Sequence, residues 1–130
     1  MNPAKILRFV ALATSTALIP ALVFAQEATV MEIVTFQAED GADTASVTAA
    51  LAPIAEKMGQ YDTLVARAVS EGPDGTWTMV NYWTDRDAMN RINEEALTWP
   101  EFGALPGVAN LETLQMQQLD IAASVGLDGE

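Results

Sequence analysis

The stretch MVNYWTDRDAMNRI, residues 79–92, passes from the pattern of a strand to the pattern of a helix within a few residues. It begins inside the segment 76–83 (TWTMVNYW), which is rich in the β-branched and aromatic residues that strands favour. Thr84, followed three residues later by Asp87, resembles a capping box at a helix start. An apolar stripe at helical spacing then follows at Ala88, Met89, Ile92 and Ala96. The stretch therefore predicts a strand that leads directly into an amphipathic helix.

Upstream of this stretch, the sequence predicts a first strand and a first helix. Residues 29–38 (TVMEIVTFQA) are nearly all apolar, which is typical of a strand covered on both faces. Helical spacing begins after Asp43 or Thr44, either of which can cap the helix, and it ends near Gly59. The apolar face of this helix consists of Val47, Leu51, Ile54 and Met58. Pro53 lies inside the helix and lacks a backbone N–H, so we expect a kink or a break there.

Two further segments complete the middle of the chain. Residues 62–70 (DTLVARAVS) have strand composition, and the turn formers at 71–75 connect them to the strand 76–83 as a hairpin. Residues 98–101 (TWPE) repeat the start signal of a helix, with proline at an early helical position. The short helical piece that follows carries Phe102 and Leu105.

Residues 111–121 (LETLQMQQLDI) supply the last strand, so the predicted order is βαββαβ. This order is the ferredoxin-like α+β arrangement, a four-stranded antiparallel sheet with two helices on one face. The opposite face also needs a cover, because both sides of the first strand are apolar. One side carries Met31 and Ile33, and the other carries Val30, Val34 and Phe36. A second copy of the same sheet is the simplest cover, so we expect a homodimer that packs through this face.

The N-terminus has the three parts of a secretory signal: a short basic region, an apolar run at residues 9–24, and small residues before a cut after Ala25. A membrane span is disfavoured, because the run has about 16 residues, contains Pro20, and a span needs about 20. The chain has no cysteine, which leaves no residue for a lipid anchor or a disulfide. The predicted organisation is a cleaved signal peptide at 1–25, a periplasmic or secreted domain at 26–121 and a flexible C-terminal tail at 122–130.

Charge excludes two classes of partner. Two of the six basic residues lie in the predicted signal peptide and all eighteen acidic residues lie after it, so the mature chain carries a net charge of −14. Nucleic acids and anionic membranes bind clustered Lys and Arg, which this chain lacks. We therefore expect no nucleic acid and no membrane as a partner after cleavage, and an acidic surface that favours solubility.

Residues 30–120 resemble the antibiotic biosynthesis monooxygenase-like domains of the dimeric α+β barrel superfamily. The resemblance rests on the element order, the hairpin that ends in Tyr82-Trp83, the following TDRDAM, and Pro100-Glu101-Phe102. It implies a homodimer in which two sheets pack face to face, with a pocket between the helices and the sheet of each subunit. Some members of that family oxidise aromatic polyketides with molecular oxygen and without metal or flavin, some cleave haem, and many have no known reaction.

The resemblance also implies which residues bind a ligand. Trp83 matches a tryptophan that lines the pocket in several members, and Asn81 and Met79 alternate with it along the same side of the strand. Gln37 corresponds to a polar residue that some members place on the first strand. A small, flat, apolar or aromatic ligand, oriented by the Asn81 amide, suits this set. The remaining large aromatics are assigned to the core: Phe36, Trp77 and Trp99.

The absence of histidine and cysteine excludes much chemistry. Neither a Ser-His nor a Cys-His nucleophile can form, and no imidazole or thiolate is available for a metal. Haem-cleaving relatives use a histidine on the second helix, near Asn90 or Arg91 of this chain, so haem cleavage by that mechanism is disfavoured. Residues 39–43 (EDGAD) lack the ligand spacing of a calcium loop and suit a turn with a helix cap. We expect no metal and no cofactor.

Glu32 and Arg67 each lie within a predicted strand and admit two interpretations. Both can face the pocket, where a carboxylate acts as a base and a guanidinium stabilises an enolate or peroxide anion. Alternatively, they form a structural bridge at the dimer interface or lie on a strand edge open to water, which is the interpretation that the sequence favours. Asn81, Glu32 and Arg67 are therefore weak catalytic candidates.

Three classes of function stay open from the sequence. The first is a cofactor-independent monooxygenase that acts on an aromatic or quinol-type compound, in which the substrate itself reduces oxygen. The second is a non-catalytic periplasmic domain that binds a small apolar ligand. The third is a structural dimer whose pocket is filled as core.

Overall fold

The computed structural model describes residues 27–127, so the predicted signal peptide and residues 128–130 lie outside the described residues. The elements follow the predicted order. They are β1 (Val30–Ala38), α2 (Thr44–Met58), β2 (Leu64–Glu71), β3 (Thr76–Trp83), α3 (Arg86–Ala96), the 3₁₀ helix η1 (Pro100–Gly107) and β4 (Ala109–Asp120).

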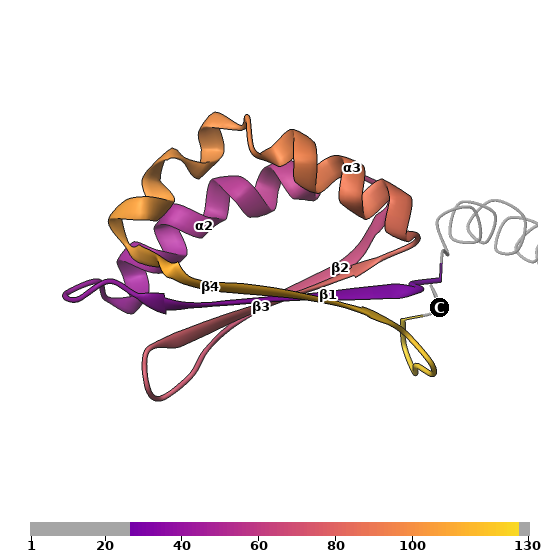
Figure 1. Ribbon diagram of the computed structural model, residues 1–130, viewed down its shortest axis with the longest axis horizontal. Coiled ribbons are helices and arrows are strands. Elements are labelled where there is room, and N and C mark those ends of the chain that lie inside the picture. Colours follow the sequence, from indigo (N-terminus) through magenta and orange to yellow (C-terminus); the bar gives the residue numbers. More distant parts are fainter. Residues whose placement is uncertain (1–26, 128–130) are drawn as a thin grey trace, which may run out of the picture.

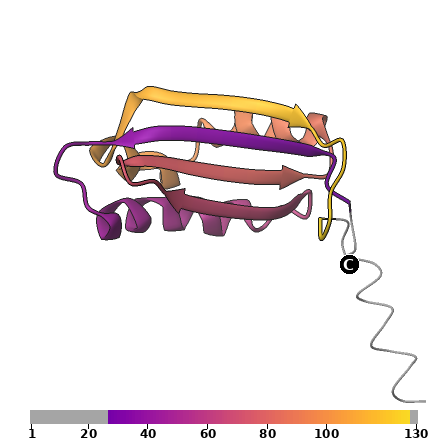
Figure 2. The same ribbon diagram turned by 90° about the horizontal axis from the view of Figure 1, so that it is seen from below.

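The four strands form one antiparallel sheet in the order β2-β3-β1-β4. Figure 1 shows α2 and α3 above the same face of this sheet, and Figure 2 shows the opposite face with no described segment across it. The predicted ferredoxin-like fold is confirmed. No helix in the described range is both long and apolar enough to cross a membrane.

Alternation along the two central strands sorts their side chains into an inner and an outer set. On β3, Trp77, Met79, Asn81 and Trp83 are buried beneath the helices, and the residues between them are partly exposed on the outer face. The register places β1 residues of the same orientation opposite them, for example Phe36 opposite Trp77, and these two rings stack at 6.5 Å. On the outer face, apolar side chains gather toward one end, at Met31, Ile33, Ala66, Val80, Tyr82 and Leu119, and polar ones lie toward the other, including Thr35, Thr78 and Gln115.

Helix α2 begins at a complete capping box. The carboxylate of Asp43 accepts from the backbone N–H of Ser46 (2.8 Å), and the Ser46 hydroxyl accepts from the backbone N–H of Asp43 (3.1 Å). Of the kink or break expected at Pro53, the break does not occur, because α2 continues through this residue to Met58. Pro53 is exposed on the outer side of the helix, opposite the buried stripe. The predicted apolar face of α2 is confirmed.

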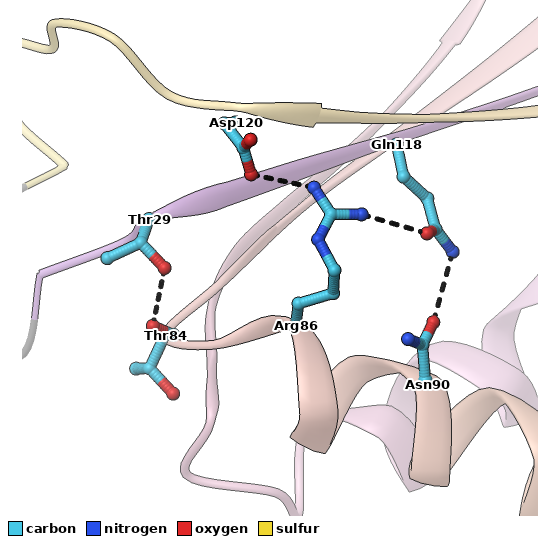
Figure 3. Close-up of polar contacts among 6 residues, drawn as sticks. All are labelled: Thr29, Thr84, Arg86, Asn90, Gln118 and Asp120. Atoms are coloured by element: carbon cyan, nitrogen blue, oxygen red, sulfur yellow. Dashed lines mark hydrogen bonds and ion pairs between the residues drawn. The ribbon is translucent and has the colours of Figure 1, made fainter.

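Helix α3 begins one residue later than the sequence suggested. Asp85, rather than Thr84, is the N-cap, and its carboxylate accepts from the backbone N–H of Ala88 (2.7 Å). The predicted capping box is therefore wrong, because the main chain of Thr84 is still part of the sheet end: its N–H donates to the carbonyl of Thr63 (2.9 Å). Its own carbonyl accepts from the hydroxyl of Thr29 (2.7 Å) (Figure 3).

Side chains at the start of α3 hold this helix to the edge strand β4. Arg86 donates to the amide oxygen of Gln118 (3.1 Å) and forms an ion pair with Asp120 (2.7 Å), and Gln118 in turn donates to Asn90 (3.3 Å) (Figure 3). The chain after β4 turns back toward β1, where the backbone N–H of Ala28 donates to the carbonyl of Leu127 (3.0 Å). These contacts fix the end of the sheet that lies beside the first turn of α3.

Candidate functional site

A cavity of about 380 Å³ lies between the helical layer and the inner face of the sheet. Most of its lining is apolar, including Val34, Leu51, Ile54, Ile92, Leu105 and Met116. Two lining residues are strongly exposed, Leu97 at 86% and Met116 at 51%, so the cavity reaches the surface between the end of α3 and the edge strand β4. Its size and apolar lining suit a small organic molecule.

The lining contains four charged or amide side chains, and they form one hydrogen-bonded group. At its centre is the carboxylate of Glu32, which is only 1% exposed. Oε1 of Glu32 accepts from the amide of Asn81 (3.0 Å) and from the indole N–H of Trp83 (3.2 Å), and Oε2 accepts from the amide of Asn93. A carboxylate can be buried in this way because several N–H donors replace its lost hydration.

Arg67 extends this group toward the edge strand β2. Its Nη1 donates to Oδ1 of Asn81 (2.8 Å), so the Asn81 side chain links the guanidinium to the carboxylate of Glu32. The sulfur atoms of Met58 and Met79 are the other acceptors, each at 3.3 Å. Burial lowers the pKa of Arg67, and the negative charge of Glu32 acts in the opposite direction.

The strand register brings these residues together from distant parts of the sequence. Asn81 lies opposite Glu32 in the β1–β3 pair and opposite Arg67 in the β2–β3 pair. The three side chains therefore form a row across the inner face of the sheet. Asn93 completes the group from above, since it lies four residues after Met89 on the buried side of α3.

The structure overturns the interpretation that the sequence favoured for Glu32 and Arg67. Both side chains face the helices, not the outer face or open water, and both line the cavity. They form no direct bridge, because each is hydrogen-bonded to Asn81 instead. Asn81, Glu32 and Arg67, the three catalytic candidates, are thus brought into one cluster, and their catalytic role stays a prediction.

The four residues predicted to bind a ligand divide into two pairs. Asn81 and Met79 line the cavity. Trp83 does not: it is 0% exposed and lies beside Glu32 on the inner face of the sheet, where its indole N–H donates to that carboxylate. Gln37 is also outside the lining, at the other end of β1, where its amide donates to the hydroxyl of Thr76. A ligand role for Trp83 therefore has to act through Glu32.

Sequence reasoning missed Asn93, although a signal for it was present. Asn93 is a polar residue within the apolar stripe of α3, between Met89 and Ala96 at spacings of four and three. Asn90, near the predicted position of a haem ligand, points instead to Gln118 of β4 (Figure 3). Trp99 is buried as predicted but also lines the cavity, stacked between Tyr61 (5.9 Å) and Phe102 (6.1 Å).

Within residues 27–127, no three Asp or Glu side chains lie close enough together to hold a metal ion. The charged and amide groups that line the cavity are one carboxylate, one guanidinium and two amides. Such groups can take up a proton, stabilise an anion and orient a ligand.

The fold is that of the antibiotic biosynthesis monooxygenase-like domains. Among solved structures, the chain is similar to SnoaB, a cofactor-independent oxygenase from Streptomyces nogalater, with a TM-score of 0.58, 19% identity, and coverage of 76% of this chain and 98% of that one. It is also similar to a putative antibiotic biosynthesis monooxygenase from Chloroflexus aurantiacus, with a TM-score of 0.55, 13% identity and coverage of 76% and 98%.

A third similar structure is a putative antibiotic biosynthesis monooxygenase from Deinococcus radiodurans, with a TM-score of 0.52, 18% identity and coverage of 75% and 96%. No protein-family model matches the sequence, and no curated protein sequence matches it. At these identities the likeness defines the fold, and the function has to be argued from the site.

Proposed function

We propose that this protein is a cofactor-independent monooxygenase that oxidises a small, electron-rich aromatic or quinol-type compound in the cavity beneath α2 and α3. One observation carries the proposal: the carboxylate of Glu32 lines a largely apolar cavity, where the amides of Asn81 and Asn93 donate hydrogen bonds to it. The oxygenase activity of a protein with the same fold, SnoaB, adds support.

The proposed reaction begins with transfer of a proton from the substrate to Glu32. For an anthrone, which has a CH₂ group between two aromatic rings, this leaves a resonance-stabilised anion. The anion transfers electrons to molecular oxygen and forms a carbon–oxygen bond, which gives a peroxide anion. This anion takes back the proton from Glu32 and becomes a hydroperoxide. Loss of water then leaves a quinone, so that one oxygen atom enters the product and the other leaves in water. The substrate supplies all the electrons, and no metal or flavin enters the balance.

The surroundings of Glu32 suit this chemistry. The largely apolar lining lowers the polarity around the anion and the hydroperoxide, which strengthens each electrostatic interaction in the cavity. The amides of Asn81 and Asn93 fix the position of the carboxylate, so it is oriented before the substrate enters.

A second candidate function is binding without turnover. Both oxygens of Glu32 already accept hydrogen bonds, which suits a fixed structural group as well as a base. In that case the protein is a periplasmic domain that holds a small apolar ligand. The third class, a structural dimer with a filled core, is less favoured because the described residues enclose a cavity of about 380 Å³.

We also propose that the protein is exported after cleavage behind Ala25 and that it forms a homodimer through the outer face of the sheet. The outer face supports the second statement, since Met31, Ile33, Val80 and Tyr82 form an apolar patch toward one end of it and no described segment covers this patch. A second sheet would remove these side chains from water.

Oxygen uptake with anthrone tests the proposed reaction. The wild-type protein should accelerate uptake above the rate without protein, and Glu32→Gln should lower the increment at least about 100-fold, which is typical for loss of a general base. Glu112→Gln is the matched control, because Glu112 is exposed on β4 and does not line the cavity. Equal rates in wild type and Glu32→Gln would contradict the proposal. Saturable quenching of tryptophan fluorescence without oxygen uptake would support the binding function instead.

A further inference from the structure

The guanidinium of Arg67 is the only positive charge among the cavity-lining residues of the described chain. It carries five N–H donors but finds a single oxygen acceptor in residues 27–127, Oδ1 of Asn81. Its other contacts go to the thioether sulfurs of Met58 and Met79, which are weak acceptors. The hydrogen-bonding capacity of this cation is therefore only partly used by the protein.

A second observation points the same way. Nε of Arg67 is shielded from solvent and has no hydrogen-bond partner within the described part of the chain. A buried donor without an acceptor costs free energy, and in a native site it is usually explained by function or by a group that binds there.

Glu32 does not supply the missing acceptor. Its two oxygens accept from Asn81, Trp83 and Asn93, and it acts on Arg67 only through space, by opposing the effect of burial on the arginine pKa. The ion pair recorded in residues 27–127 joins Arg86 and Asp120, outside the cavity. Arg67 thus has no carboxylate in direct contact, although it lies in a largely apolar environment.

We infer that the ligand of this cavity carries an ionised oxygen acid, either a carboxylate or an acidic phenol or enol, and that Arg67 binds this group and so determines specificity. A charged oxygen is a much stronger acceptor than a thioether. The side chains of Met58 and Met79 are unbranched and flexible, so they can move aside when the acid enters. The aromatic body of the ligand then lies along Val34, Leu51, Ile54 and Ile92.

This inference rests on the proposed use of the cavity as the ligand site, but not on oxygen chemistry. It also gives Arg67 and Glu32 separate tasks. Arg67 holds an acid that is already ionised, whereas Glu32 removes a proton elsewhere on the substrate. Oxygen uptake therefore tests the proposed role of Glu32, and ligand affinity tests the proposed role of Arg67.

Calorimetric titration of the protein purified from cells expressing the full chain tests the inference. The first probes are naphthalene-2-carboxylate and its neutral carboxamide, which have nearly the same shape. A third probe, 7-hydroxycoumarin, is titrated below and above its own pKa and represents the acidic phenol. We expect at least one acid to bind about tenfold more tightly than its neutral form, since a charged hydrogen bond replaces a weak one.

Three variants make the result specific to Arg67. Arg67→Gln should abolish the preference for the ionised form, and Arg67→Lys should restore part of it. Arg91→Gln, which removes one positive charge from an exposed site on α3, should leave the preference unchanged. Circular dichroism and thermal melts confirm that each variant is folded.

The outcomes separate this inference from the proposed reaction. Preferential binding of an acid without oxygen uptake from any substrate would support the role of Arg67 and contradict the oxygenase. Oxygen uptake with neutral anthrone, together with equal affinity for each acid and its neutral form, would support the oxygenase and overturn this inference. Failure of both acids to bind would also overturn it.

Discussion

The indole nitrogen of Trp83 donates a hydrogen bond to Oε1 of Glu32 across 3.2 Å, from a position with no exposure to solvent. The tryptophan does not line the cavity and acts on it through Glu32. Together with Asn81 and Asn93 it supplies the hydrogen-bond donors of the Glu32 carboxylate. Without these donors, burial of a carboxylate in an apolar interior would cost free energy. The orientation of Glu32 depends on all three donors.

Replacement of Trp83 by phenylalanine should show this dependence. Trp83→Phe removes the N–H and part of the ring, so we expect a loss of about 1–3 kcal/mol in the free energy of unfolding and a lower rate of oxygen uptake. Trp77→Phe is the matched control, since Trp77 is buried on the same side of β3 and also lies outside the cavity lining, but it makes no recorded hydrogen bond to Glu32 within the described residues. It should lower stability and leave the rate unchanged. A rate that falls equally in both variants would exclude a specific role for the indole N–H.

Asn93 should prove as important as the residues on the strands. Asn93→Ala removes the donor that α3 provides to Oε2 of Glu32, and a hydrogen bond to a charged group contributes about 1.5–3 kcal/mol. Urea unfolding should show a loss of this size. Asn90→Ala serves as the control, because its contact to Gln118 is exposed and should contribute less. A smaller loss for Asn93→Ala than for Asn90→Ala would contradict this account of the site.

Alternation and helical spacing were sufficient to predict the elements and the inner face of β3, because both depend on local periodicity. The register of each strand pair could not be predicted from a single sequence. The register that places Asn81 between Glu32 and Arg67 decides whether those charges face the cavity or the outside. Trp83 was predicted to line the cavity but is fully buried outside it. Its burial could not be predicted for a similar reason, since it depends on how closely α3 lies over the sheet. Asn93 was not predicted, because the partner that a polar residue within an apolar stripe meets depends on how the helix packs on the sheet.

The choice between Thr84 and Asp85 as the N-cap of α3 can be measured directly. Asp85→Ala should lower the free energy of unfolding by about 1 kcal/mol, because the backbone N–H of Ala88 loses its acceptor. Thr84→Ala should have a much smaller effect, since the recorded contacts of Thr84 are made by its main chain. The two variants are compared by thermal unfolding under identical conditions. A larger loss for Thr84→Ala would restore the cap that the sequence suggested.

Acid should weaken the start of α2 in a predictable range of pH. The backbone and side chain of Ser46 lower the pKa of Asp43 below its ordinary value of 3.8. An acid whose pKa is lower in the folded state contributes stability that is present above its unfolded pKa and is lost as the pH falls through the folded pKa. The contribution of Asp43 should therefore be complete at pH 5 to 7 and decline below pH 3.8.

Asp43→Asn provides the comparison, because asparagine can cap the helix without titrating. The difference in unfolding free energy between wild type and Asp43→Asn should be constant at neutral pH and should shrink or reverse below pH 3.8. Unfolding is followed by circular dichroism from neutral to acidic pH. A difference that stays constant down to the lowest pH would show that Asp43 does not titrate differently in the folded chain.

The proposed dimer places the outer face of the sheet in contact with a second copy. A charge introduced at the centre of this face should therefore separate the two subunits. Val80 lies there on β3, opposite Ile33 of β1 and Ala68 of β2. Val80→Arg would bury a guanidinium without a partner in the apolar patch of the outer face, which is strongly unfavourable. Sedimentation equilibrium should give about twice the mass of the chain for wild type and the mass of one chain for Val80→Arg. Thr48→Arg, on the exposed side of α2, should stay dimeric. A wild-type protein that sediments as a monomer at every concentration would contradict the dimer, because it would show that the folded monomer is stable with this face exposed to water.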